Sequence, residues 1–296
     1  MHIVINGWFI DQPSTGSGQY IRQLVARLPV IAPQHECHLI VPHRRSFKVI
    51  DLPANLQPPR LHSRRSNFLK LLFEQSIIPR AADALRADLI HIPYWAPPLR
   101  ARVPIVVTIH DVITMVLKEY RGGPLVRLYT GLVTAAARGA ALILTDSEAS
   151  KRDIVQHLGV PESRVRTIYL AADPKFTPRP NAVDLAAVRR KYDLPDDYVL
   201  YLGGFDPRKN VEAALQVYTW GQAAIGYTHP LVVAGRLPET SNGFFSDPRE
   251  IARQIEVEDV VRCIGEVDET DVVALVQGAT ALLYPSRYEG FGLPAL

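Results

Sequence analysis

Short apolar runs alternate with segments of helical periodicity along most of the chain. The runs are apolar on both faces, which is typical of strands covered by helices on both sides of a sheet. This alternation predicts an α/β protein with parallel sheets. A first series of strands is expected at 2–6, 37–41, 88–92, 104–109 and 141–145, and a second series at 165–169, 198–202, 230–234, 260–264 and 280–284. Helices are expected at 19–28, 66–85, 125–138, 147–158, 209–224 and 269–278.

A break in this pattern predicts two domains. Segment 172–183 carries three prolines and no apolar period, and the length of 296 residues suits about two domains. We place an N-terminal domain at 1–176 and a C-terminal domain at 177–296, both Rossmann-like and facing a cleft. Ligands of open parallel sheets lie beyond the carboxyl ends of the strands, so the loops there are the places to look for chemistry.

The charge is divided unevenly between the two halves. The net charge is +3, but residues 1–180 hold 23 Lys and Arg against 13 Asp and Glu, whereas residues 181–296 hold 10 against 17. A basic half favours an anionic partner such as phosphate or lipid. The acidic half disfavours wrapping by nucleic acid, so no nucleic-acid partner is expected.

Targeting signals and cysteines indicate a cytoplasmic protein. The chain begins directly with a predicted strand, and its longest apolar stretch, 131–144, falls short of the roughly 20 residues of a membrane span. Cys37 and Cys263 lie far apart in strand-like runs. Two buried, reduced thiols are the expected state.

Two loops of the N-terminal half carry candidate residues. Gly16 and Gly18 follow the first strand and open a helix, where close backbone approach and the helix N-terminus favour an anion. A dinucleotide fingerprint fails because Ile21 replaces the third glycine, and a plain strand–helix turn is the alternative. His110 follows a buried strand in TIHDV, at the strand end that should face the cleft. In TDSEASK, Ser147 suits a helix N-cap.

The stretch GGFDPRKN places Arg208 and Lys209 at the start of a helix. Two cations there are electrostatically unfavourable, since a helix N-terminus already carries partial positive charge. The placement makes sense if a diphosphate binds both side chains and the backbone N–H groups. A solvated Arg–Lys pair is the alternative.

The last residues, EGFGLPAL, combine an acid with a Gly-rich loop before an expected helix. The Glu289 carboxylate can accept hydrogen bonds from hydroxyl groups, and the amides of Gly290, Phe291 and Gly292 can donate others. Such a loop suits a polyol. It suits a phosphate poorly, because Glu289 would repel it.

In this order, the stretches TGSGQYI, HD, TDSEASK, GGFDPRKN, CIGEVDETDVVALVQGATALLYPS and EGFGLPAL resemble the retaining glycosyltransferases of family 4, which have the GT-B fold. The resemblance covers nearly the whole chain and lies nearest to bacterial mannosyltransferases of O-antigen or exopolysaccharide. It implies a nucleotide-sugar donor, with GDP-mannose favoured, a glycan or lipid-linked acceptor, no cofactor and no metal.

The resemblance also implies roles for individual residues. His110 and Glu289 would be catalytic, with His110 near the donor sugar and Glu289 gripping it together with the amides of Gly290, Phe291 and Gly292. The donor would further be bound by Gly16, Gly18, Arg208, Lys209 and, near the base, Glu266.

Two departures from the family pattern are visible. Gly204 stands where many relatives carry arginine, and the family's second glutamate, eight residues after Glu289, would be residue 297. We therefore expect a C-terminal domain that is cut short, weak diphosphate binding and little transfer by residues 1–296.

Other readings stay open. One is a sugar-nucleotide epimerase or a phosphorylase, although neither an epimerase acid/base pair nor a pyridoxal-phosphate lysine is evident. Another is a non-catalytic or inactive nucleotide-sugar-binding protein. Segment 64–78 combines Arg64, Arg65 and Lys70 with bulky apolar residues, which suits either a core helix or binding to an anionic membrane surface.

Overall fold

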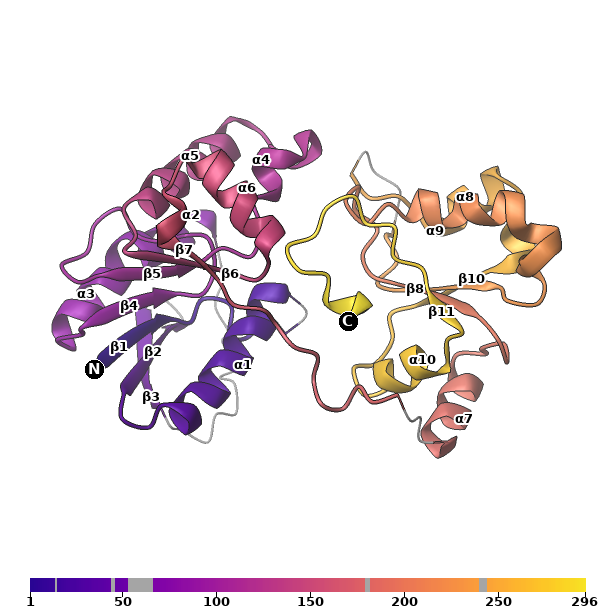
Figure 1. The fold of residues 1–296 in the computed structure, drawn as a ribbon, viewed down its shortest axis with the longest axis horizontal. Helices are drawn as coiled ribbons and strands as arrows, with labels where there is room; N and C mark the ends of the chain where they lie inside the picture. The colour runs from indigo at the N-terminus through magenta and orange to yellow at the C-terminus, as the bar shows by residue number, and fades with distance from the viewer. Residues whose placement is uncertain (14, 44–45, 53–65, 179–181, 240–243) are drawn as a thin grey trace. The chain divides into compact units, whose positions relative to one another are not determined.

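The structure is a computed structural model that describes residues 1–13, 15–43, 46–52, 66–178, 182–239 and 244–296. The chain divides into two compact units, Met1–Tyr169 and Leu170–Leu296 (Figure 1). The boundary expected between residues 176 and 177 falls a few residues after this division. Each unit is built around its own sheet, as the alternating pattern predicts.

The first unit contains a seven-stranded sheet. β1 pairs in parallel with β2 on one side and with β4 on the other, and the sheet continues in parallel through β5, β6 and β7. In sheet order, the strands are β3 (Ser46–Leu52), β2 (Glu36–His43), β1 (His2–Asn6), β4 (Leu89–Ile92), β5 (Ile105–Thr108), β6 (Leu142–Thr145) and β7 (Val165–Thr167).

Two details of this sheet correct the sequence-based expectation. β3 was not expected, and it runs antiparallel to β2 at the edge of the sheet, so the sheet is not wholly parallel. Lys48 and Asp51 interrupt the apolar run of this strand, which therefore lacks the signature of a strand buried on both faces. The run at 165–169, placed in the second series, forms β7 of the first sheet.

Alternate residues of the strands fill two separate cores, one on each face of the first sheet. Val4 and Ile40 belong to one core, whereas Ile3, Ile5 and Leu39 belong to the other. Because side chains alternate along a strand, this division requires that both faces be covered. The helices are α1 (Gly16–Ile31), α2 (Asn67–Leu72), η1 (Phe73–Ile77), α3 (Ile78–Ala84), α4 (Ile113–Val116), η2 (Lys118–Tyr120), α5 (Pro124–Arg138), α6 (Glu148–Leu158) and η3 (Glu162–Arg164).

The second unit contains a four-stranded parallel sheet in the order β10 (Val261–Gly265), β9 (Leu231–Ala234), β8 (Val199–Leu202) and β11 (Ala281–Leu282). Two helices of this unit, α7 and α9, were not expected from the sequence. α7 follows the proline-rich stretch used to place the boundary, and α9 is short and begins at a proline. The helical segments are α7 (Ala182–Lys191), α8 (Val211–Gly221), η4 (Gln222–Gly226), α9 (Pro248–Gln254), η5 (Glu258–Val260), α10 (Val272–Gly278) and η6 (Leu293–Ala295).

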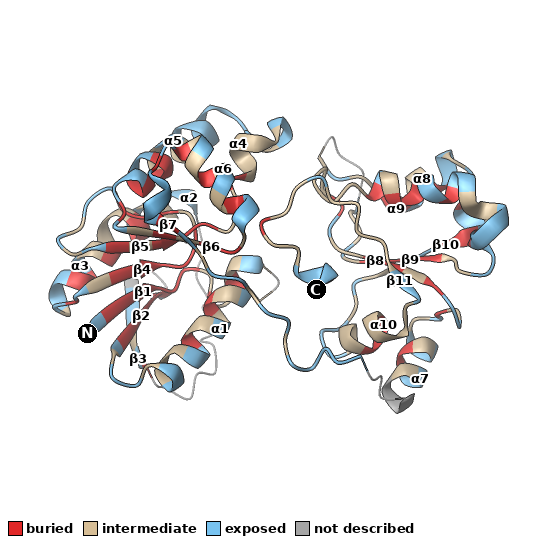
Figure 2. Cartoon of the chain, in the orientation of Figure 1, coloured by how far each residue is buried: buried red, intermediate tan, exposed pale blue. Residues whose placement is uncertain are grey.

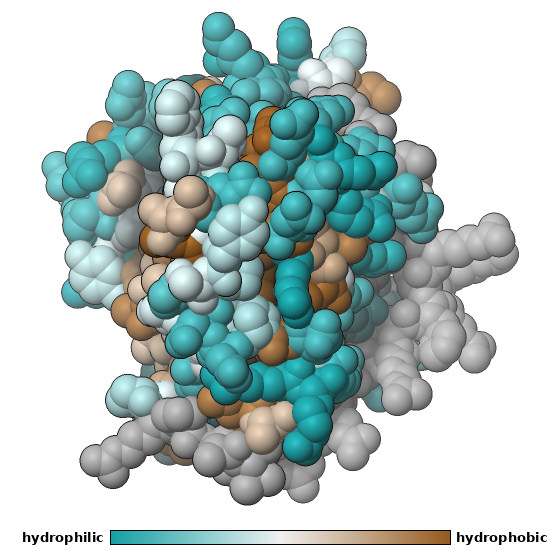
Figure 3. All heavy atoms as spheres, turned by 90° about the vertical axis from the view of Figure 1, so that its right-hand side faces the viewer, coloured by the Kyte–Doolittle hydropathy of each residue, from teal (hydrophilic) through white to brown (hydrophobic). Residues whose placement is uncertain are grey.

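Burial follows this layering. In both units buried residues concentrate on the strands and on the helix faces that cover them (Figure 2). The face of the second unit that lies at the right of Figure 1 is mostly hydrophilic, with hydrophobic residues in separate patches (Figure 3). Both cysteines are free; Cys37 is buried as expected, but Cys263 is only partly buried. None of the helices in the described ranges combines the length and apolarity that crossing a bilayer requires.

Candidate functional site

In the second unit, two loops meet because their strands are neighbours. β8 and β11 are adjacent and parallel, so the loops that follow them leave the same edge of the sheet. The Arg287 N–H donates to the Arg208 carbonyl at 2.8 Å, and Asn210 Nδ2 donates to the Pro285 carbonyl at 3.2 Å. These bonds fasten the Gly-rich loop after β8 to the loop that carries Glu289.

Asp206 and Asn210 shape the loop between β8 and α8. Asp206 Oδ1 accepts from the Arg208 N–H at 3.2 Å, and its carbonyl accepts from the Lys209 N–H at 3.0 Å. Asn210 has φ 53°, a left-handed conformation that is uncommon outside glycine and often marks functional sites. The turn ends there and α8 begins at Val211, so Arg208 and Lys209 precede the helix N-terminus directly.

Both cations converge on one carboxylate. Lys209 Nζ lies 2.8 Å from Glu289 Oε1, and Arg208 Nη1 lies 2.6 Å from Glu289 Oε2. The three side chains are partly buried, at 14%, 22% and 19% exposure for Lys209, Arg208 and Glu289. Lys209 Nζ also donates to the Tyr284 hydroxyl at 3.3 Å. The sequence predicted Arg208 and Lys209 as one candidate site and Glu289 as another, whereas the structure joins them in one cluster.

The cations keep the carboxylate ionised. Burial raises the pKa of Glu289, but the hydrogen bond and charge of Lys209, with the charge of Arg208, outweigh burial and lower it below its usual value. Burial and a hydrogen bond to Glu289 raise the pKa of Tyr284, whose hydroxyl therefore stays protonated at neutral pH. Asp206 Oδ1 also lies 3.7 Å from Arg208 Nε, so the cluster holds two cations, two carboxylates and a neutral phenol.

The remaining predicted donor residues of this unit also follow strands. Gly290 is buried, and Gly292 has φ 93°, which favours glycine. The helix expected after this loop is a single 3-10 turn, η6. Glu266 is exposed and directly follows β10, whose last residue, Gly265, also has positive φ. Their roles toward a donor stay predictions.

In the first unit, His110 follows β5 and meets a buried acid that follows the adjacent strand β6. His110 Nδ1 lies 2.6 Å from Asp146 Oδ2, and the Asp146 side chain is 4% exposed. His110 Nε2 lies 3.3 Å from the Pro93 carbonyl, and Ser150 Oγ donates to the His110 carbonyl at 3.0 Å. The Tyr20 ring stands edge-on to the imidazole. Three of these contacts fix the orientation of the imidazole ring, and the fourth holds the backbone of His110.

Gly16 and Gly18 both lie in the first turn of α1 but differ in surroundings. A Cβ at Gly18 would lie 1.9 Å from the Gln12 carbonyl oxygen, whereas a Cβ at Gly16 would have nothing within 4 Å. The Gly18 N–H already donates to Thr15 Oγ1, the N-cap of the helix. Gly18 therefore has a packing role in the turn, and Gly16 offers an open backbone surface.

Sequence reasoning missed several residues that shape the two groups. Asp146 lies in the stretch TDSEASK, for which only Ser147 was predicted to have a role. The structure confirms Ser147 as the N-cap of α6. Asp206 and Asn210 lie in GGFDPRKN, and Tyr284 opens the turn before Glu289. A polar residue directly after a buried strand was a usable signal for Asp146. Tyr20, in the second turn of α1, follows no strand and gave no such signal.

Comparison with known proteins identifies the family. Residues 14–176 match Glycosyltransferase Family 4, and residues 187–296 match Glycosyl transferases group 1. The chain is 33% identical over 302 residues to O-antigen chain mannosyltransferase B of Escherichia coli, covering 97% of this chain and 77% of that protein. It is 29% identical over 194 residues to the serotype-specific mannosyltransferase WbdA of Escherichia coli, covering 63% of this chain but 23% of that protein.

Solved structures of low sequence identity share the fold. Sucrose-phosphate synthase from Thermosynechococcus elongatus superposes with a TM-score of 0.66 at 18% identity, covering 99% of this chain and 77% of that one. WaaG, a glycosyltransferase involved in lipopolysaccharide biosynthesis, gives 0.66 at 16% identity with the same coverage. Anabaena HepE in complex with UDP and glucose gives 0.62 at 15% identity, covering 99% and 76%. The chain belongs to glycosyltransferase family 4, and it is a GT-B glycosyltransferase of the mannosyltransferase type.

Proposed function

We propose that this chain transfers a mannosyl residue from GDP-mannose to a growing, lipid-linked bacterial glycan, with retention of configuration. One observation carries the proposal: Arg208 and Lys209 converge on Glu289 at the N-terminus of α8. The mannosyltransferase relatives support the sugar. Structural neighbours bound to UDP support a nucleoside diphosphate leaving group.

In this proposal the Glu289 carboxylate occupies, in the absence of donor, the place beside Arg208 and Lys209 that the diphosphate would take. Two partly buried cations need counter-charges; Glu289 contacts both of them, and Asp206 contacts Arg208 as well. A diphosphate offers more charge and more acceptor oxygens, so it would displace the carboxylate from Arg208 and Lys209. The freed Glu289 could then accept hydrogen bonds from the hydroxyl groups of the sugar.

The chemical step is a transfer at the anomeric carbon. The bond from that carbon to the diphosphate oxygen breaks, and a bond to the acceptor hydroxyl oxygen forms on the same face of the sugar. The acceptor proton passes to the leaving diphosphate. Arg208 and Lys209 stabilise the charge that develops on that diphosphate, so neither a metal ion nor a cofactor is required. His110, oriented by Asp146, would contact the sugar.

We further propose that the first unit docks on an anionic membrane surface, which would hold a lipid-linked acceptor on the cytoplasmic side. Phe68 on α2 is 72% exposed, and Leu125 and Leu128 on α5 are 82% and 73% exposed. The two helices are neighbours, since Lys70 Nζ lies 5.2 Å from the centre of the Tyr129 ring.

Two arginines, Arg121 and Arg127, lie close to Leu125 and Leu128 in the sequence. Arg121, Arg127 and His157 help to line a pocket of about 530 Å³ at the start of α5. Apolar side chains next to cations are the combination that favours an anionic bilayer surface. Arg64 and Arg65, which also prompted this prediction, lie outside the described residues. Flotation with anionic vesicles at low and high salt tests the proposal, and the exchange Leu125→Glu should reduce binding. Absence of binding at low salt would reject it.

Donor preference is tested by thermal shift with GDP, UDP, ADP and their sugar conjugates, followed by product analysis with labelled donors. A ligand at 100 times its dissociation constant adds ~2.7 kcal/mol to stability, so the preferred base should stand out. Transfer of mannose from GDP-mannose in the presence of EDTA supports the proposal. Binding without transfer to any acceptor, in a form of the protein that includes the second glutamate of the family pattern, would favour the non-catalytic hypothesis. Release of an altered nucleotide sugar would favour an epimerase.

A further inference from the structure

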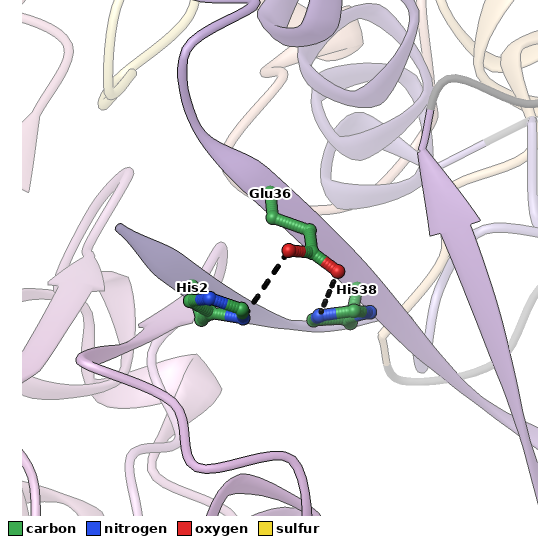
Figure 4. A group of neighbouring side chains, drawn as sticks. All are labelled: His2, Glu36 and His38. Atoms are coloured by element: carbon green, nitrogen blue, oxygen red, sulfur yellow. Dashed lines mark ion pairs between the residues drawn. The ribbon is translucent and has the colours of Figure 1, made fainter.

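A cluster of two histidines and a glutamate lies at the amino ends of β1 and β2, away from the loops described above. His2 pairs with Glu36 in the parallel register of the two strands, and His38 follows Glu36 by two residues. Because side chains alternate along a strand, all three project from the same face of the sheet. Figure 4 shows the Glu36 carboxylate between the two imidazole rings.

The spacing of the three side chains suits a metal ion. His2 Nδ1 lies 3.4 Å from Glu36 Oε2, and His38 Nε2 lies 3.7 Å from Glu36 Oε1. One ligand atom from each residue can be chosen so that all lie within 4.8 Å of one another. Bonds of about 2.0–2.2 Å in a tetrahedral site separate neighbouring ligand atoms by about 3.4 Å, so small side-chain movements would complete it.

Asp51 orients one of the rings. It opposes His38 in the antiparallel register of β2 and β3, and its Oδ1 lies 2.6 Å from His38 Nδ1. The Nδ1–H therefore donates to Asp51, which directs Nε2 toward Glu36. A carboxylate–histidine pair of this kind commonly fixes the ring of a metal ligand. His38 is 6% exposed in its side chain, so the ring is held in place by packing as well.

We propose that His2, Glu36 and His38 bind a divalent transition-metal ion, Zn²⁺ being the best match to two imidazoles and one carboxylate. With this donor set the cation would be four-coordinate, with water as the fourth ligand. The ion would join β1 to β2 at the amino ends of these strands. His110 lies at the other end of the sheet, because it follows the carboxyl end of β5. The site is therefore structural, and glycosyl transfer does not pass through it.

The test uses tag-free protein stripped with a chelator and titrated with Zn²⁺ against a competing fluorescent chelator. We expect one saturable site and a rise in melting temperature with Zn²⁺, but not with Mg²⁺, which prefers oxygen ligands. Glu36→Gln and His2→Gln should each weaken Zn²⁺ affinity more than tenfold. His43→Gln, at the other end of β2, should leave it unchanged. Asp51→Asn should weaken it about 10–100-fold, as expected for loss of an orienting partner.

Cobalt substitution supplies an independent readout. Co²⁺ in a four-coordinate site has intense visible absorption, which should appear with the unaltered protein and be lost in Glu36→Gln. Absence of saturable Zn²⁺ binding would overturn the proposal and leave the cluster as a histidine–glutamate ion pair. His2 and Glu36 are exposed, so we expect both variants to fold. If Glu36→Gln and His2→Gln bind Zn²⁺ as tightly as the unaltered protein does, the ion binds elsewhere and the proposal is overturned.

Discussion

Lys209 Nζ and Glu289 Oε1 lie 2.8 Å apart, although 80 residues separate them in the chain. The contact exists because β8 and β11 are neighbouring parallel strands, so the loops after them meet. It pairs a cation that is unfavourable at a helix N-terminus with the partly buried carboxylate of Glu289, so that each charge offsets the other. A donor would have to exchange this pair for its own charges.

Lys209→Ala should weaken binding of a nucleoside diphosphate by about 1.5–3 kcal/mol, because a charge-assisted hydrogen bond to the diphosphate is lost. Binding of the nucleoside alone should hardly change. Isothermal titration with both ligands measures the difference. Lys175→Ala, an exposed lysine of the same unit, is the matched control. Equal losses for nucleoside and diphosphate would contradict the assignment.

Glu289→Gln should have opposite effects on two ligands. The neutral amide no longer competes for Arg208 and Lys209, so affinity for the free nucleoside diphosphate should rise about three- to tenfold, on the order of 1 kcal/mol. The additional affinity that GDP-mannose has over GDP should fall, because the amide is a weaker hydrogen-bond acceptor for the hydroxyl groups of the sugar. Parallel titrations with GDP and GDP-mannose separate the two. A loss of GDP affinity would show that Glu289 organises the cations rather than competing with the donor.

The ion cluster should make stability depend on pH in the acid range. The pKa of Glu289 is lower in the folded protein than its usual value, so its contribution to stability is present above the unfolded pKa of about 4.3. That contribution is lost as pH falls through the lower folded pKa. The difference in melting temperature between the unaltered protein and Glu289→Gln should therefore be constant from neutral pH to about pH 4.3 and shrink as the pH falls further. A difference between them that does not vary with pH would contradict this linkage.

Gly18→Ala should destabilise the protein by about 1–3 kcal/mol, because the new Cβ would lie 1.9 Å from the Gln12 carbonyl oxygen. Gly16→Ala, two residues earlier in the same turn, meets no atom within 4 Å and should be neutral or slightly stabilising. Urea denaturation of the two variants compares them directly. Equal effects would mean that the turn rearranges to accept a side chain at either position.

His110→Ala and Asp146→Asn should lower turnover by roughly tenfold or more, because both changes disturb the contact that His110 is proposed to make with the sugar in the transition state. A tenfold loss corresponds to about 1.4 kcal/mol. Donor affinity should stay within about threefold. The shared effect is expected because Asp146 Oδ2 holds His110 Nδ1 at 2.6 Å. The measurement is kcat and donor dissociation constant in a form of the protein with transferase activity. A variant that loses donor binding but keeps its rate would indicate a binding role.

The chain pattern alone predicted the α/β class, most strands and the loops that deserve attention. Strands such as β1 and β8 are apolar on both faces, because helices cover both sides, and this leaves a clear local signal. The unfavourable position of Arg208 and Lys209 was equally local, since it needs only a helix start and the sign of the charges. By contrast β3, α7 and α9 were missed, because an edge strand and short helices carry mixed or weak periodicity.

Only the tertiary structure decided which polar groups meet. His110 and Asp146 are brought together by the pairing of β5 with β6, and both cations reach Glu289 through the pairing of β8 with β11. The cluster of His2, Glu36 and His38 likewise depends on the register between β1 and β2. Sequence periodicity tells which face of a strand is buried, but not which strand lies beside it. That choice is made by long-range hydrogen bonding and packing, which no local pattern encodes.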